Sequence, residues 1–260
     1  MRMHKIKAMV YRDFLIMFRI KARVAESFYF PVTTIIIWGL FSTFVRDYAA
    51  EAGFVVLAMN VFWNFAYLAQ SNTNIQIMED SWSGSIRQIL VSGITELEYL
   101  VSRLISSTIV SLIVMALMLA MSYYIFGLSV IASKFAIIIA FMLLTLMSSI
   151  ALAGIIGAFM IMLGKEYGFL AWTSMQLFVV FSAPFYPVSI MPPLLQAVAQ
   201  AMPFTKIFEG MRMLISSGSV SSDIMLHGLA VSLIYFVASF PLFVLAFRRA
   251  RKTGRLARMS

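Results

Sequence analysis

The sequence has 260 residues, of which 62% are hydrophobic and only 12% are charged, and its net charge is +9. A soluble domain of this length keeps about a quarter of its residues charged, so the composition excludes a soluble globular protein and predicts an integral membrane protein. The sequence contains no cysteine, which excludes disulfide bonds and thiolate metal sites.

The basic residues crowd the two ends of the chain. Residues 1–27 hold seven Lys or Arg, and residues 248–260 hold six. This distribution is typical of segments that face anionic membrane lipid. It therefore argues against nucleic acid as the partner of the positive charge.

Residues 1–26 are predicted to form an amphipathic helix that lies along the membrane interface. On a helical wheel of about 100° per residue, one narrow face is basic and the opposite arc is apolar. The basic face consists of Lys5, Arg12, Arg19 and Arg23. The alternative, in which these charges only set the orientation of the chain, is less favoured because the basic residues share one face.

Six runs without charge follow, and each approaches the roughly 20 residues that cross a hydrocarbon core of about 30 Å. Because the runs are continuously apolar rather than alternating, they predict helices and not the strands of a barrel. The expected fold is an all-α integral membrane domain over 1–260 with six transmembrane helices. The runs are 27–45, 53–69, 104–126, 135–163, 169–185 and 224–247.

The orientation follows from the loops between these spans. With the N-terminus in the cytoplasm, the inner segments hold sixteen Lys or Arg and the outer loops hold four. Basic residues are enriched in cytoplasmic loops, so both termini are expected to be cytoplasmic. The polar run 70–74 either ends the second span or lines a wet cavity.

Two features of the spans concern packing and backbone. Ser149, Ala153 and Gly157 form a stripe of small residues that permits close helix approach, and we favour packing within one subunit over a subunit interface. Four prolines interrupt the uncharged stretch after the fifth span. There the sequence predicts a short re-entrant helix over Leu194–Met202 between spans five and six.

The cytoplasmic loop 70–103 contains a second amphipathic segment, at 79–94. Its apolar residues share one helical face, whereas Glu79, Asp80 and Arg87 are polar. Such a helix either docks into a groove of a soluble partner or rests on the lipid, and the pattern alone leaves both open. The apolar face consists of Ile86, Ile89, Leu90 and Ile94.

The run Gly84–Gly93 resembles the Gly-Thr-Leu-Glu-x-Leu-Leu-x-x-Pro motif of type-2 ATP-binding-cassette (ABC) exporter permeases. A second stretch, from Met191–Gln196 through Met202–Thr205 to Arg212, is similar to the family's Leu-Pro…Asn-Pro…Arg sequence. The resemblance implies that 79–94 is the coupling helix that sits on an ATPase subunit. The residues implied to couple to the ATPase are Glu79, Asp80, Gly84, Ile86, Arg87, Gln88 and Leu90.

Three residues depart from the family pattern. Arg87 stands where the family usually has Glu, Gly93 where it has Pro, and Met202 where it has Asn. The change at Arg87 alters any salt bridge assumed at the coupling surface.

The resemblance implies the permease subunit of an ATP-driven exporter in a prokaryotic plasma (inner) membrane, with a drug, lipid or glycan-type substrate. The permease is expected to be non-catalytic and to bind no nucleotide cofactor, because its only Gly-Lys pair, Gly164–Lys165, lacks the following Ser or Thr of a phosphate-binding loop. No metal is expected either, because the sequence has no cysteine and only two histidines, His4 and His227. ATP and Mg²⁺ are expected on a separate cytoplasmic ATPase. The other expected partners are membrane lipid and a second copy or paralogue of the permease.

Aromatic residues in the second and fifth spans are candidates for a substrate path, although aromatics are also ordinary lipid-facing residues. The alternative function is a stand-alone secondary carrier or channel, which would need charged or polar groups at mid-membrane. The candidate path residues are Trp63, Tyr67, Phe178, Phe181 and Tyr186.

Overall fold

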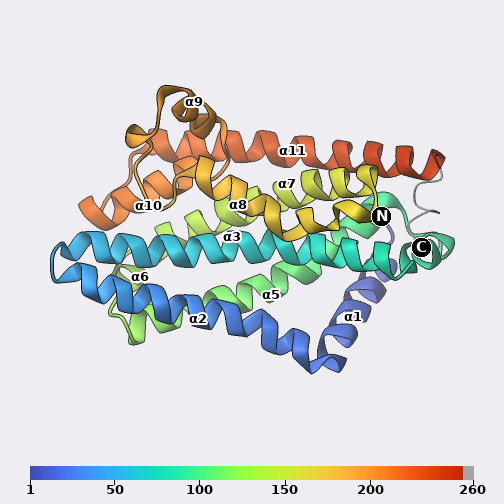
Figure 1. Cartoon of the computed structure of the whole chain (residues 1–260), viewed down its shortest axis with the longest axis horizontal. Helices are drawn as coiled ribbons and strands as arrows, with labels where there is room; N and C mark the ends of the chain where they lie inside the picture. The colour runs from blue at the N-terminus through green and yellow to red at the C-terminus, as the bar shows by residue number, and fades with distance from the viewer. Residues whose placement is uncertain (254–260) are drawn as a thin grey trace.

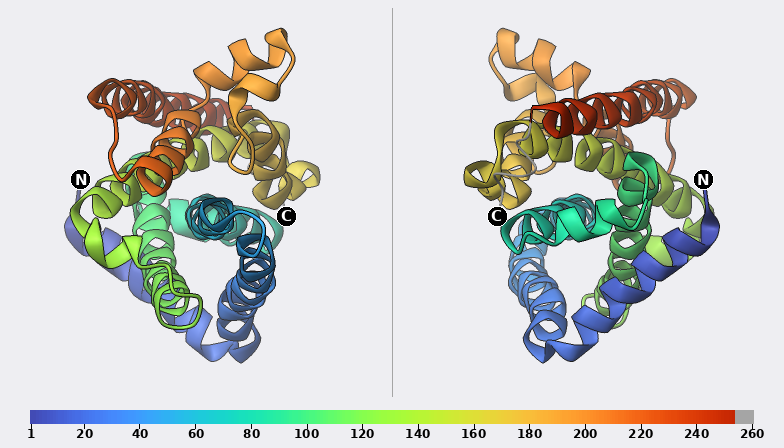
Figure 2. Two further views of the ribbon diagram at one scale, coloured as in Figure 1. Left: turned by 90° about the vertical axis from the view of Figure 1, so that its left-hand side faces the viewer. Right: turned by 90° about the vertical axis from the view of Figure 1, so that its right-hand side faces the viewer.

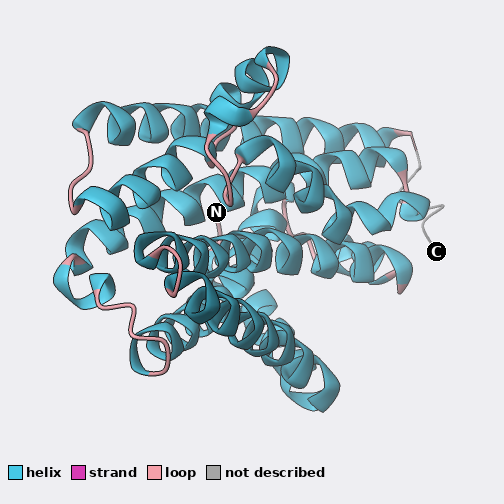
Figure 3. Cartoon of the chain, turned by 60° about the vertical axis from the view of Figure 1, so that its left-hand side comes forward, coloured by secondary structure: helices cyan, strands magenta, loops and turns pink. Residues whose placement is uncertain are grey.

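The computed structural model describes residues 1–253, and every regular element in that part of the chain is a helix (Figure 3). Five long helices run side by side (Figure 1): α2 (Lys21–Arg46), α3 (Ala50–Trp82), α5 (Glu96–Tyr124), α7 (Phe135–Leu163) and α11 (Ser222–Lys252). The shorter elements are α1 (Met3–Arg19), α4 (Ser85–Val91), α6 (Val130–Ser133), η1 (Lys165–Phe169), α8 (Leu170–Ser182), η2 (Val188–Ile190), α9 (Pro193–Ala201) and α10 (Thr205–Ser217).

The five long helices are each long and apolar enough to cross a membrane. They coincide with five of the six predicted spans, which confirms the all-α membrane class. The predicted span 169–185 corresponds to α8, which has 13 residues. At 1.5 Å per residue α8 is only about 20 Å long, which is shorter than the hydrocarbon core. A sixth crossing therefore remains a prediction.

The two ends of the bundle differ in what they carry. One end, called the α4 end here, holds α4 between the end of α3 and the start of α5, and the opposite, α6 end holds α6 and the α2–α3 turn (Figure 1). The N-terminus and the last turn of α11 both lie at the α4 end. Residues 254–260 of the predicted basic C-terminal segment lie outside the described residues.

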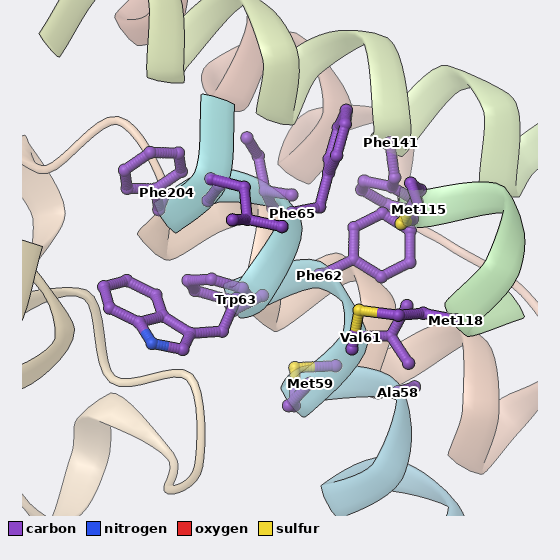
Figure 4. Close-up of a cluster of buried hydrophobic side chains, with 14 of the residues drawn as sticks. Ala58, Met59, Val61, Phe62, Trp63, Phe65, Met115, Met118, Phe141 and Phe204 are labelled. Atoms are coloured by element: carbon purple, nitrogen blue, oxygen red, sulfur yellow. The ribbon is translucent and has the colours of Figure 1, made fainter. Parts of the chain in front are cut away.

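Helix α3 forms the centre of the structure, because it contacts α2, α5, α7, α8 and α10. Several of its apolar side chains, among them Phe62 and Phe65, are fully buried against residues of α5 and α7. Figure 4 shows Phe62 and Phe65 of α3 beside Met115 and Met118 of α5 and Phe141 of α7. The polar run 70–74 lies within α3 and does not end it.

Helices α7 and α11 pack closely along their lengths. A Cβ added at Gly154 would lie 3.1 Å from the Cβ of Ser239, and one at Gly157 would lie 3.0 Å from Ile77. Because the small-residue stripe of α7 is buried against α11 and α3, it serves packing within this chain, as favoured from the sequence.

The predicted interfacial helix of residues 1–26 is divided in the structure. Helix α1 ends at Arg19, and Ile20 has a non-helical backbone (φ −99°, ψ 87°) before α2 begins at Lys21. The chain turns here because α1 crosses the α4 end of the bundle, whereas α2 runs along the bundle (Figure 2). Arg23 consequently belongs to α2.

The proline-rich stretch forms η2 and α9, so the helix expected over Leu194–Met202 is present at Pro193–Ala201. Helix α8 ends at Ser182, and the backbone of the next residue, Ala183, is left-handed (φ 49°). The Arg212 guanidinium of α10 donates hydrogen bonds to the carbonyl oxygens of Ala183, Pro184 and Tyr186 at 3.1, 3.1 and 2.9 Å. Arg212 therefore fixes the turn after α8.

Candidate functional site

Helix α4 is bounded by two glycines with left-handed backbone. Gly84 has φ 68° and Gly93 has φ 74°, a region that glycine enters without steric cost. Between them, the side chains of Ile86 and Ile89 are buried against neighbouring helices. The segment expected as one helix over 79–94 is thus the end of α3, a turn at Gly84, and the separate short helix α4.

Lys5 of α1 holds the C-terminal end of α4. Its ammonium group donates hydrogen bonds to the carbonyl oxygens of Ser92 and Gly93, at 3.1 and 2.6 Å. The last carbonyls of a helix lack intrahelical partners and carry partial negative charge. The Lys5 side chain therefore caps α4 from a different helix.

Arg12 of α1 reaches the other end of α4. Its guanidinium lies 2.9 Å from Asp80 Oδ1 and 3.4 Å from the Ser85 hydroxyl oxygen. The Ser85 hydroxyl also donates a hydrogen bond to Asp80 Oδ1 at 2.7 Å. Lys5 and Arg12 together attach α1 to both ends of α4.

A buried ionic network lies directly beneath these contacts. Arg103 of α5 forms ion pairs with Asp13 of α1 and with Asp80 of α3, the latter at 2.5 Å. The Tyr99 hydroxyl donates to Asp80 Oδ2 at 2.9 Å, and the Ser106 hydroxyl donates to Asp13 Oδ2 at 2.8 Å. Each of the three charged side chains is less than one-tenth exposed, so the network ties α1, α3 and α5 into one unit.

The basic face predicted for the N-terminal segment is used mainly for contacts within the chain. Lys5 and Arg12 bind the α4 region, and Arg23 forms an ion pair with Glu79 of α3 at 2.5 Å. Arg19 is exposed at the end of α1. Three of the four basic residues are therefore engaged within the chain, and an interfacial position of this face remains a prediction.

The predicted coupling residues differ in how far their side chains are exposed. Asp80, Ile86 and Gly84 are buried or half-buried, and the Asp80 carboxylate is fully engaged in the network. Glu79 and Leu90 are half-buried, whereas Arg87 and Gln88 are exposed. Val91, which the sequence analysis did not single out, is 89% exposed. The outward face of α4 consists of Arg87, Gln88 and Val91.

Two further contacts join the α4 end to the second half of the chain. Glu96, at the start of α5, lies 3.7 Å from the Arg248 guanidinium and 3.4 Å from that of Arg251. The Trp82 indole N–H donates to the carbonyl oxygen of Lys165 at 3.0 Å. The ends of α3, α5, α7 and α11 are thus connected around α4.

A cavity of about 890 Å³ opens beside this network, between α1, α2, α3, α5 and α8. On α2 its lining extends from Arg23 to Trp38, and on α3 from Asp80 to Asn60. The cavity therefore reaches from the α4 end into the part of the bundle that the apolar spans form. Its polar α3 lining includes Ser71 and Asn72, so part of the run 70–74 lines a cavity, one of the two alternatives the sequence left open.

The cavity ends toward the α6 end at a pair of stacked aromatic rings. Trp38 of α2 and Phe185, which follows α8, have ring centroids 5.1 Å apart and planes 6° apart. Both side chains line the cavity, and such offset stacks are favourable. This contact joins α2 to the turn that Arg212 fixes.

Two of the five predicted path residues, Trp63 and Tyr67, line the cavity. The other three are placed elsewhere. Phe178 packs on the main core, and Phe181 is half-buried. Tyr186 packs on a small cluster near α9, and its hydroxyl donates a hydrogen bond to the carbonyl oxygen of Val180. The sequence missed Trp38 and Phe185 as cavity residues, because aromatic residues occur throughout the spans.

The sequence analysis also missed Asp13 and Arg103. One signal for Asp13 was available, because on the wheel of residues 1–26 its carboxylate falls in the middle of the apolar arc. An acid on an apolar face needs a buried partner. Arg103, at the start of the third predicted span, is that partner in the structure.

A family model for ABC-2 type transporters matches residues 4–216. The matched region contains all but the first residue of α1, the buried network of Asp13, Asp80 and Arg103, and all of the residues that line the cavity. A comparison with curated proteins gave no match.

Proposed function

The chain belongs to the ABC-2 type transporter family, and from this premise we propose that it is the permease subunit of an ATP-driven exporter. It would move a drug, lipid or glycan-type substrate outward across a prokaryotic plasma membrane. A separate cytoplasmic ATPase would bind ATP and Mg²⁺ and supply the energy. The permease performs no chemistry and instead converts ATPase contacts into a shift between two of its own conformations.

The single observation that carries this proposal is the attachment of α4. Its outward face is exposed at Arg87, Gln88 and Val91, and its two ends are held by Lys5 and Arg12 of α1. A force applied to the exposed face is therefore passed to α1 and, through Asp80 and Arg103, to α3 and α5. A helix that merely rested on lipid would need no such connections.

The cavity supplies the substrate site in this proposal. It begins next to the network and ends at the Trp38–Phe185 stack, so a tilt of α1 and α2 changes its shape directly. Release toward the outside requires that the stack separate. A second permease copy or a paralogue would complete the path on the open side of the cavity.

Six crossings with cytoplasmic termini belong to the same proposal. Helix α7 ends at the α4 end and α11 begins at the α6 end (Figure 1), so residues 164–221 must return the chain across the bundle. Helix α8 with η1 would make most of that crossing, and α10 would complete it. In this proposal α4, the N-terminus and the end of α11 share one side of the membrane. The excess of basic residues in the segments on that side supports its being the cytoplasmic side.

A stand-alone carrier is the second candidate. It is favoured by one observation, the buried polar side chains Asn60, Gln70 and Asn74 in the middle of α3. A carrier driven by an ion gradient would transport without nucleotide, whereas the exporter requires ATP hydrolysis. Transport into inverted vesicles with and without ATP separates the two.

The exporter proposal is tested by purifying the tagged chain from its native host and identifying the proteins bound to it. The expected result is a stoichiometric ABC ATPase, which is lost when Arg87 and Val91 are both changed to Asp. The matched control changes Tyr48 and Tyr124 to Asp in the same way. These two residues are 78% and 82% exposed and lie toward the α6 end. A chain that carries no ATPase, or an ATPase retained equally by both variants, would contradict the proposal.

A further inference from the structure

The charged side chains that line the cavity do not balance one another. Three of them are arginines, and each forms an ion pair with a carboxylate that also lines the cavity. Arg12 pairs with Asp80, Arg23 with Glu79, and Arg103 with both Asp13 and Asp80. The fourth carboxylate of the lining is Glu26 of α2. Among the residues that the structure describes, no basic group lies within ion-pair distance of Glu26, so the cavity carries one excess negative charge.

Glu26 is positioned to present this charge to a bound molecule. Arg23 lies one turn earlier on α2, but its guanidinium is directed to Glu79 at 2.5 Å. Glu26 is exposed, so its carboxylate is accessible to a molecule that enters the cavity. A carboxylate beside an apolar wall attracts a cation more strongly once a ligand displaces the water.

The remaining lining is suited to the body of such a cation. Aromatic rings of Phe30, Trp38, Trp63, Tyr67 and Phe185 line the cavity, and the faces of aromatic rings attract positive charge. The cavity volume of about 890 Å³ is in the range of drug-sized ligands.

We propose that the cavity selects amphipathic organic cations, with Glu26 as the counter-charge and the aromatic residues as the apolar wall. This inference rests on the proposed exporter function and narrows its substrate class. It favours cationic drug-like molecules over anionic lipids and anionic glycans. The recognition is by charge and apolar surface, so it does not require a single chemical scaffold.

The test uses two probes of the same shape and opposite charge, tetraphenylphosphonium and tetraphenylborate. Binding of each to the purified full-length chain in lipid nanodiscs is measured by equilibrium dialysis, with empty nanodiscs as the blank. The expected result is saturable binding of tetraphenylphosphonium and tighter binding of that cation than of the anion. Tighter binding of tetraphenylborate would overturn the proposal.

The variants assign the preference to Glu26. We expect Glu26→Gln to weaken tetraphenylphosphonium binding about tenfold, the effect of removing one nearby charge, and Glu26→Lys to reverse the preference between the probes. Glu51→Gln is the control, because Glu51 is an exposed carboxylate near the other end of the bundle and does not line the cavity. Equal affinities in the wild type, Glu26→Gln and Glu51→Gln would contradict the assignment.

The outcome is independent of the test of ATPase binding. If an ATPase co-purifies but the two probes bind equally, the exporter stands and the substrate class is wrong. If tetraphenylphosphonium binds through Glu26 but no ATPase is found, the cation site stands and the exporter proposal fails.

Discussion

The ammonium group of Lys5 donates a hydrogen bond to the carbonyl oxygen of Gly93, with 2.6 Å between the two atoms, although the residues are 88 positions apart in the chain. This contact joins the first helix of the protein to the end of α4. It places a charge of α1 at the negative end of a short helix, where it is favourable. It also makes α1 part of the unit that responds when α4 moves.

Replacement of Lys5 by Ala is expected to weaken coupling more than folding. The contact is near the surface, so its loss should cost only about 1 kcal/mol, equivalent to about 2–4 °C in Tm for a chain of this size. Substrate-stimulated ATP hydrolysis by the reconstituted complex should fall severalfold. Lys7→Ala is the control, because Lys7 is exposed on the same helix, and an equal loss in both variants would show that Lys5 has no special role.

Replacement of Arg103 by Met is expected to destabilise the protein strongly. It leaves the carboxylates of Asp13 and Asp80 buried without this partner, which typically costs about 3–5 kcal/mol. The thermal midpoint is measured by size-exclusion chromatography of heated, detergent-solubilised protein. Arg248→Ala should cost less than about 1 kcal/mol, because Arg248 is 59% exposed and 3.7 Å from Glu96. Similar midpoints for the two variants would contradict a structural role for the network.

Replacement of Gly93 by Pro should disrupt the end of α4. Proline fixes φ near −65°, whereas Gly93 has φ 74°, so the turn must rearrange and the Lys5 contact is lost. Restoring the residue that is usual in the family therefore lowers activity in this chain. Gly93→Asn is the control, because Asn tolerates left-handed backbone. The measurement is ATPase stimulation, and higher activity in the Pro variant than in the Asn variant would refute the expectation.

Replacement of Trp38 by Ala removes the stack with Phe185 that ends the cavity. We expect faster nucleotide-independent leak of tetraphenylphosphonium from proteoliposomes, by severalfold, because the stack is worth about 0.5–1.5 kcal/mol beyond its buried area. Leu40→Ala, at an exposed position of the same helix, should leave the leak unchanged. A leak that does not differ between the two variants would show that the stack does not close the cavity.

Local features of the α4 region could be predicted from the sequence. Ile86 and Ile89 have the helical spacing that was predicted, and Gly84 and Gly93 stand where the chain turns. Both isoleucines are buried within the chain itself, whereas the pattern predicted that they would face a partner's groove or lipid. The extent of the helix could not be predicted, because Glu79 and Asp80 continue α3 and only the backbone at Gly84 separates the two helices. Periodicity alone does not reveal such a turn.

The long-range contacts could not be predicted from the sequence, for a different reason. The pairing of Arg12 with Asp80 and of Lys5 with Gly93 depends on the direction in which α1 leaves the bundle, and that direction is set at Ile20. Neither Pro nor Gly lies near Ile20, so the sequence does not indicate that the helix is interrupted there. Likewise, the short α8 is indistinguishable from a full span by hydropathy, because its uncharged residues continue through the turn that Arg212 holds.

The most direct test of the central claim, that α4 is the contact with the ATPase, uses the absence of cysteine from the sequence. A single cysteine at Val91 or Gln88 is labelled with benzophenone maleimide, and the native complex is irradiated. The account predicts a covalent adduct of the permease with an ABC ATPase from both positions, and none from a cysteine at Tyr48, near the opposite end of the bundle. An adduct from Tyr48, or none from Val91 and Gln88, would contradict it.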